Sequence, residues 1–182
     1  MCRAHCLNHS VSEELFELVD EDGRVIGTAP RSKCHGDPSL AHRSVHVFVH
    51  DRRGDLYLQK RSPTKDVQPG KWDTSAGGHL APGETYEQAA VRELAEELGV
   101  RVASSSLVPR HDYVWRTSIE TEHVRTYELT YEGTIMPDRV EIDEGRYWSL
   151  AEIRQSCGRG IFTPNLKHEL RRLGIVTDDP VT

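Results

Sequence analysis

The sequence predicts a single α/β domain in which helices pack on a mixed β-sheet. Three observations support this fold class. Short runs of alternating apolar residues are typical of strands, helical segments carry recognisable caps, and no internal repeat or Gly/Ser/Pro-rich linker divides the 182 residues. A chain of this length can bury enough apolar surface to fold as one domain. We expect that domain over residues 13–175, with flexible ends at 1–12 and 176–182.

Strands are expected first in two hairpins. The first hairpin spans 15–28, where two apolar segments flank an acidic turn that ends in glycine. The second spans 45–58, where apolar residues alternate on both sides of the turn at 51–54. Three further strands are expected, at 107–116, 123–131 and 146–148.

The strongest helix prediction covers Glu84–Leu98. Its apolar residues repeat at i, i+3, i+4 and i+7, and Gly99 is placed to end the helix. A short helix is expected at 149–153 behind a capping serine. A third is expected over 163–174, where threonine caps the helix and proline occupies the first position. Strands interleaved with three helices favour the α/β class.

Composition excludes several classes of function. The chain has 23 Lys+Arg against 29 Asp+Glu, a formal net charge of −6, which argues against coating a nucleic acid polymer but not against binding a small phosphorylated ligand. No apolar run approaches the roughly 20 residues that span a bilayer. Residues 1–10 lack the apolar core of a signal peptide, so we expect a cytoplasmic protein without a membrane partner. The four cysteines are too scattered for a disulfide framework: Cys2, Cys6, Cys34 and Cys157.

Three glutamates share one face of the 84–98 helix. Glu93, Glu96 and Glu97 lie opposite its apolar residues, and the i, i+4 pair of like charges weakens a bare helix. Such a face is either simply solvated or a cage for hard divalent cations, because carboxylate oxygens are the ligands that Mg²⁺ and Mn²⁺ prefer.

The surrounding pattern favours the cation cage. Gly78 is followed after five residues by Glu84, and after seven more by Arg-Glu-Leu-Ala-Glu-Glu-Leu-Gly-Val over 92–100. This stretch resembles the Nudix box at every fixed position. The resemblance implies the Nudix α/β/α sandwich with a mixed β-sheet, and Mg²⁺- or Mn²⁺-dependent chemistry on the diphosphate of a small metabolite. Many members of that family are homodimers, so a homodimer is one of the oligomeric states that the sequence leaves open.

The same resemblance assigns roles to individual residues. It implies metal ligands at Glu93, Glu96, Glu97 and the Gly78 carbonyl. Arg92 would brace the cage by pairing with a glutamate, and Glu84 would hold the loop and the helix together. Metal ions that bridge two phosphates neutralise charge and lower the pKa of the attacking water.

A second set of residues is similar to type I isopentenyl diphosphate isomerases, most clearly over 31–100. In those isomerases two histidines seven residues apart join a later histidine and a Glu-x-Glu pair around one divalent metal. The matching residues here are His35, His42, His79, Glu120 and Glu122. The resemblance also implies that three basic residues hold the diphosphate: Arg31, Arg61 and Lys65.

The sequence departs from the isomerases at the residue that carries their chemistry. Gly77 stands where they have a catalytic cysteine, and glycine leaves room for the backbone and a phosphate to come close. Alkene isomerisation needs an acid and a base on opposite faces of the carbon chain, and here Glu122 would lack its partner. We therefore expect a hydrolase of the nucleoside diphosphate-X type. Its catalytic residues would be Arg92, Glu93, Glu96, Glu97 and Glu122.

Two other functions remain open at this stage. One is an isopentenyl diphosphate isomerase with a substitute acid, for which Cys34 beside His35 is the first candidate. The other is a non-catalytic module that binds a diphosphate, although such a module does not need the repulsive glutamates. A zinc site at Cys2, His5, Cys6 and His9 is less favoured than a disordered terminus.

Overall fold

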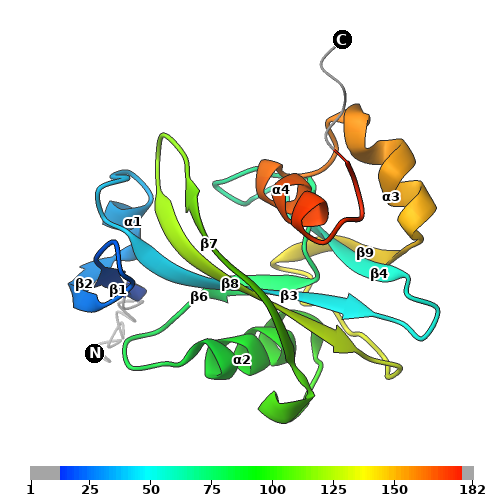
Figure 1. Ribbon diagram of the computed structural model, residues 1–182, viewed down its shortest axis with the longest axis horizontal. Coiled ribbons are helices and arrows are strands. Elements are labelled where there is room, and N and C mark those ends of the chain that lie inside the picture. The colour runs from blue at the N-terminus through cyan, green and yellow to red at the C-terminus, as the bar shows by residue number, and fades with distance from the viewer. Residues whose placement is uncertain (1–12, 178–182) are drawn as a thin grey trace, which may run out of the picture.

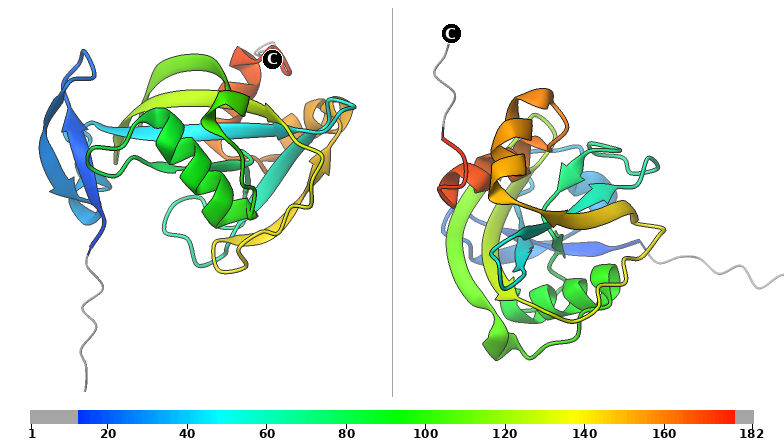
Figure 2. Two further views of the ribbon diagram at one scale, coloured as in Figure 1. Left: turned by 90° about the horizontal axis from the view of Figure 1, so that it is seen from below. Right: turned by 90° about the vertical axis from the view of Figure 1, so that its right-hand side faces the viewer.

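A computed structural model describes residues 13–177 (Figure 1). Nine strands form one mixed sheet, with helix α2 on one face and helices α3 and α4 on the other (Figure 2). The α/β/α arrangement predicted from the sequence is therefore confirmed. The strands are β1 (Leu15–Val19), β2 (Val25–Pro30), β3 (His42–His50), β4 (Leu56–Arg61), β5 (Trp72–Asp73), β6 (Ala76–His79), β7 (Val108–Arg116), β8 (Thr121–Thr130) and β9 (Ile142–Trp148). The helices are α1 (Arg31–Cys34), α2 (Tyr86–Leu98), α3 (Leu150–Ser156) and α4 (Pro164–Arg172).

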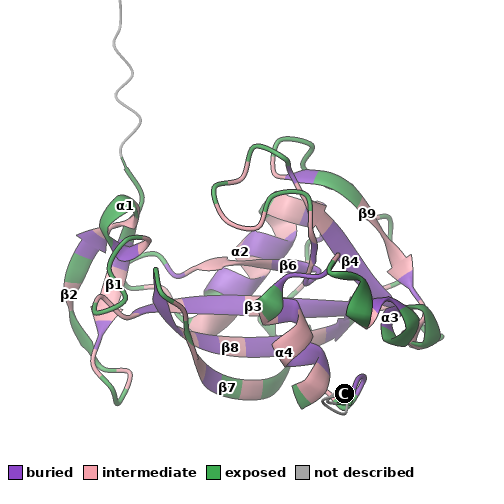
Figure 3. Cartoon of the chain, turned by 90° about the horizontal axis from the view of Figure 1, so that it is seen from above, coloured by how far each residue is buried: buried purple, intermediate pink, exposed green. Residues whose placement is uncertain are grey.

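Strand β3 lies at the centre of the sheet and positions most of the site. It pairs antiparallel with β1, β4 and β6, and parallel with β8. The parallel register begins at His42↔Glu122, and the antiparallel register with β6 begins at Ser44↔His79. Both β3 and β8 are largely buried (Figure 3). Pairing therefore brings segments from three distant parts of the chain side by side.

Two hydrophobic cores lie on opposite faces of this sheet. Alternate residues of β3, such as Val45 and Val47, pack with Leu94 and Leu98 of α2. Phe48 packs with residues of β4, α3 and α4 in the second core. That core also contains Ile175 and Val176, so packing continues one residue past the expected end of the domain. In the described part of the chain, no helix is long and apolar enough to cross a membrane.

The capping residues in the sequence predicted the ends of the helices to within a few residues. Thr85 caps α2 in a capping box with Gln88, one residue after the predicted start, and Gly99 ends the helix with φ +67°. Ser149 and Thr163 cap α3 and α4 as predicted. Both hairpins form, whereas α1 was not predicted and β9 begins four residues before the expected 146.

Candidate active site

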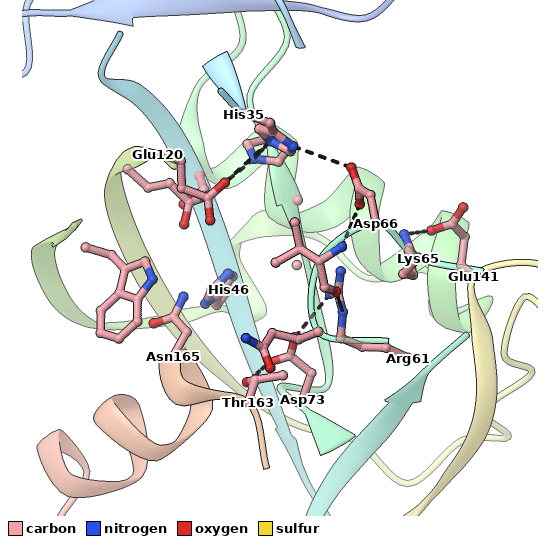
Figure 4. Close-up of a pocket in the computed structure, with 18 of the residues that line it drawn as sticks. His35, His46, Arg61, Lys65, Asp66, Asp73, Glu120, Glu141, Thr163 and Asn165 are labelled. Carbon is pink, nitrogen blue, oxygen red and sulfur yellow. Dashed lines mark hydrogen bonds and ion pairs between the residues drawn. The ribbon is translucent and has the colours of Figure 1, made fainter. Parts of the chain in front are cut away.

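A cavity of about 740 Å³ opens where β3, β6, α2 and the start of α4 meet two loops, 62–71 and 117–120 (Figure 4). Most of the residues that line it are polar or charged. Most of the residues that the sequence nominated reach it: Arg31, His35, Arg61, Lys65, Gly78, His79, Glu93, Glu97, Glu120 and Glu122. Of the nominated residues, three do not line it: His42, Arg92 and Glu96.

One wall carries what we call the glutamate cage: Gly78, Glu93 and Glu97. Glu97 accepts hydrogen bonds from the Gly77 N–H and from the Gln59 side-chain amide, both at 3.1 Å. A Cβ atom on Gly78 would overlap the Glu93 carboxylate, so glycine is needed for this close approach. These two glutamates face the sheet rather than solvent, which excludes a simply solvated acidic face.

The cage suits a cation because its carboxylates are desolvated. Burial raises the pKa of Glu97 to about 8, and the nearby Glu93 charge adds to this effect. Burial also raises the pKa of Glu93, although Arg92 partly opposes it. A divalent cation would relieve both penalties, and an all-oxygen donor set is what Mg²⁺ and Mn²⁺ select. The donor set therefore fits the predicted metal.

Arg92 braces the cage from behind. Its guanidinium donates to both oxygens of Glu84 at 2.9 and 3.0 Å, to Glu93 at 2.7 Å and to Glu96 at 3.0 Å. It also donates to the His79 carbonyl at 3.0 Å, which ties α2 to β6. Glu96 itself is 60% exposed in its side chain and reaches the site through this contact.

The other wall carries what we call the histidine cluster: His35, His42, His79, Glu120 and Glu122. One ligand atom from each histidine lies within 4.8 Å of the others. His79 Nε2 is 3.2 Å from Glu122 Oε1, and His35 Nε2 is 3.7 Å from Glu120 Oε2. His42 Nε2 and His35 Nδ1 are buried without a hydrogen-bond partner. The five residues converge as the isomerase resemblance implied.

Charges within the histidine cluster also fit a metal. Burial lowers the pKa of His35 to about 4 and lowers that of His42, so these imidazoles are neutral at pH 7. Burial and the Glu122 charge raise the pKa of Glu120 to about 7. Burial opposes ionisation of Glu122, but the His79 hydrogen bond and charge lower its pKa to about 2. Neutral imidazoles beside carboxylates suit Mn²⁺ or a transition metal.

The three predicted diphosphate-binding residues line the cavity rim, and each is paired with an acidic residue. An incoming phosphate would compete with these pairings. The pairs are Arg31 with Asp66 at 3.4 Å, Arg61 with Asp73 at 3.1 Å, and Lys65 with Glu141.

Sequence reasoning missed a polar group on the cavity floor. His46 Nδ1 lies 2.7 Å from Glu169 Oε1, and the Tyr113 hydroxyl donates to the same oxygen at 2.7 Å. Strand alternation could have found His46, because it lies on the same face of β3 as His42. Glu169 carries a weaker signal, an acid placed within the apolar stripe of α4.

The space beside Gly77 is filled, contrary to the expectation of room for a phosphate. A Cβ atom there would lie 2.6 Å from His46 Cδ2 and 3.0 Å from the Val45 carbonyl. The imidazole of His46 therefore occupies the position beside this glycine. Cys34 is buried and Cys157 is partly buried, and both are free thiols. The proposed ligands Cys2, His5, Cys6 and His9 lie outside the described residues.

Comparison with known proteins decides the family. A sequence model of the NUDIX domain matches residues 40–166. The chain belongs to the Nudix family. The isopentenyl-diphosphate Delta-isomerase of Nocardia farcinica is 38% identical over 141 residues, which cover 76% of this Nudix chain and 81% of that protein. An uncharacterized Nudix hydrolase of Streptomyces coelicolor is 32% identical over 161 residues, covering 86% of each chain.

Solved structures agree with this assignment. The crystal structure of a protein from Deinococcus radiodurans has a TM-score of 0.75 and 28% identity, covering 87% of this Nudix chain and 98% of its own. A MutT NUDIX hydrolase from Burkholderia pseudomallei shares the fold, with a TM-score of 0.62 and 18% identity. The match covers 73% of this chain and 98% of that protein. The family model and the relative named a Nudix hydrolase confirm the prediction of a Nudix hydrolase, and the structural neighbours agree with it in fold.

Proposed function

We propose that this Nudix protein hydrolyses a diphosphate linkage in a small metabolite, with Mg²⁺ or Mn²⁺ as cofactor. The observation that carries the proposal is the intact glutamate cage in the wall of a cavity with basic residues at its rim. A pure binding module has no need for two desolvated carboxylates, because burying charge without a partner costs free energy. The predicted cleavage of a nucleoside diphosphate-X compound is part of this proposal.

Each part of the cavity has a task in this reaction. Glu93, Glu97 and the Gly78 carbonyl would hold a cation, and Arg92 keeps Glu93 in position. A bound divalent cation neutralises the charge that develops on the diphosphate and lowers the pKa of the attacking water. Arg31, Arg61 and Lys65 would bind phosphate oxygens as forks or point charges, in exchange for their present carboxylate partners.

A second candidate function is isomerisation of isopentenyl diphosphate. The convergence of all five residues of the histidine cluster favours it, and so do the names of relatives such as the Nocardia farcinica protein. Against it stands Gly77, which supplies no side chain for proton transfer. Glu122 would act as an acid or base on one face alone.

One experiment separates these functions. The purified protein is incubated with CDP, UDP-glucose, ADP-ribose or isopentenyl diphosphate, each with Mg²⁺ and with Mn²⁺, and products are followed by ³¹P and ¹H NMR. We expect hydrolysis of at least one of these compounds, abolished by EDTA. Formation of dimethylallyl diphosphate without hydrolysis would support the isomerase instead. Tight binding without turnover of any compound would support the binding module.

A further inference from the structure

A buried ion pair lies on the cavity floor, outside both the glutamate cage and the histidine cluster. Glu169 on α4 is 1% exposed, and His46 on β3 is its nearest cationic partner, at 2.7 Å. The second oxygen of Glu169, Oε2, is buried without a hydrogen-bond partner. Burying a carboxylate with so few donors is costly, and a positive charge on the His46 imidazole offsets that cost.

The partners of Glu169 fix the direction of that imidazole. The Oε1 atom accepts from His46 Nδ1 and from the Tyr113 hydroxyl, which also lies 2.7 Å from Asn165. With Nδ1 bound on this side, the Nε2 atom of His46 forms no hydrogen bond to residues 13–177, and His46 lines the cavity. Figure 4 shows the ring between Glu120 and Asn165. The arrangement holds one N–H donor toward the cavity.

His46 stands next to the proposed site of chemistry. Its ring touches the position where Gly77 lacks a Cβ atom, and the N–H of that same glycine binds Glu97 of the glutamate cage. A side chain at position 77 would push the ring away. Because Gly77 has no side chain, the His46 imidazolium fits directly beside it. Gly77 is the neighbour of Gly78 in the glutamate cage.

We propose that His46, oriented by Glu169, protonates the departing group of the diphosphate substrate. The inference rests on the proposed hydrolase function and deepens it. Water forms a new O–P bond while the bridging O–P bond breaks. The electron pair of the broken bond stays on the departing oxygen. The proton on His46 Nε2 moves to that oxygen, the proton of the attacking water leaves to solvent, and His46 regains a proton from solvent.

The charge state of His46 agrees with this role. Burial alone would lower the pKa of His46, but the Glu169 charge and hydrogen bond raise it to about 9. The groups facing the ring are Glu169 from α4, Tyr113 from β7, Glu122 from β8, Asp73 from β5, and Glu97 across Gly77. His46 is therefore protonated at neutral pH and loses its proton as the pH rises through about 9.

The test compares H46Q with H50Q as a matched control. His50 lies on the same strand and also faces a carboxylate, Glu128, at 3.5 Å, but it is outside the cavity. With whichever compound of the panel the wild type hydrolyses, we expect kcat of H46Q to fall about 100-fold or more with little change in KM. H50Q should keep wild-type kinetics. An H46Q enzyme with wild-type kcat overturns the proposal.

A second variant separates proton donation from a structural role. E169Q keeps the imidazole but removes the charge that raises its pKa. The fall of kcat/KM at high pH should therefore move from about pH 9 toward about 6.5, the ordinary histidine value. A merely structural role would lower activity without moving the pH profile, and an unmoved profile in an active E169Q enzyme contradicts the proposal.

A binding measurement keeps this proposal distinct from the hydrolase function. Nitrogen-15 histidine NMR of the wild-type protein should show His46 Nε2 shifting when the non-hydrolysable probe α,β-methylene-ADP is added with Mg²⁺. If no compound of the panel is hydrolysed, the proposed function fails while this shift still reports contact at His46. If the probe binds and Nε2 does not shift, the proton-donor assignment is wrong.

Discussion

The two walls of the cavity hold acidic residues in opposite ways. In the glutamate cage an arginine stands behind the carboxylates, with Arg92 donating directly to Glu93. In the histidine cluster, within residues 13–177, no lysine or arginine side chain hydrogen-bonds to a side chain of the five members. Histidine rings lie among the carboxylates there, and Phe16 stacks on His42 and His79 with ring centroids 4.9 and 4.1 Å apart. Charged hydrogen bonds therefore hold the side chains of the cage in position, whereas packing of aromatic rings holds those of the cluster.

The largest effect should come from the cage itself. Replacing Glu97 by Gln keeps its volume and removes a buried ligand charge, so we expect turnover to fall about 100-fold or more, a loss typical of removing a key electrostatic group. Steady-state hydrolysis with saturating Mg²⁺ measures it. The variant E96Q changes the third glutamate that the resemblance names as a ligand. Because this carboxylate is exposed and does not line the cavity, we expect E96Q to lose much less. Equal losses in the two variants would refute the distinction between them.

Replacing Arg92, which braces the cage, should lower the stability of the folded protein. R92Q breaks charged hydrogen bonds to Glu84, Glu93 and Glu96, so we expect the free energy of unfolding to fall by about 2 kcal/mol. R92K should restore part of that loss, because one ammonium cannot reproduce the guanidinium fork. Urea denaturation in EDTA provides the measurement. If R92Q is as stable as the wild type, the cage does not depend on its arginine.

The histidine cluster should respond in metal affinity instead. H42Q removes a fully buried proposed ligand, and we expect Mn²⁺ binding at the cluster to weaken by at least about tenfold, the scale seen even for outer-shell changes. Titration followed by electron paramagnetic resonance should find two sites in the wild type. E97Q should keep the cluster site while H42Q keeps the cage site. A single site lost in both variants would show that the two walls share one ion.

The smallest effect concerns how the free energy of unfolding in EDTA depends on pH. The pKa of Glu97 is raised to about 8, so the folded state holds its proton more tightly than the unfolded chain. Wild-type stability without metal therefore falls as the pH rises from about 4.5 to about 8, and E97Q should lack this fall. We expect E97Q to be more stable than the wild type at pH 8 by at least about 1 kcal/mol, because each unit of a raised pKa corresponds to about 1.4 kcal/mol. Urea midpoints in EDTA at pH 5 and pH 8 test the sign, since the two proteins should converge at the lower pH.

The sequence predicts these two walls unequally. The cage could be found because Glu93 and Glu97 lie on one helix, where helical spacing alone brings them together. The histidine cluster depends on the parallel register that sets His42 beside Glu122, 80 residues away, and spacing says nothing of that register. Family resemblance supplied it.

Neither helical spacing nor family resemblance predicted the contact between His46 and Glu169 on the cavity floor. Glu169 meets His46 because α4 packs across the sheet, a contact between elements more than 100 residues apart. The sequence showed that Gly77 lacks a side chain but not what fills the space. Local caps and turns were predictable because each depends on neighbouring residues, whereas this contact depends on packing in the whole domain.

The crowding of Gly77 by His46 limits the order in which substitutions can be accepted. A cysteine introduced at position 77 meets the imidazole at once, so G77C alone should be strained. A small residue at position 46 must come first. H46S would remove the clash with the imidazole but not the close approach to the Val45 carbonyl, and it would leave Glu169 without its cation. A mutational route from this chain to a thiol-bearing one therefore passes through at least three coupled positions, and single-step searches will miss it.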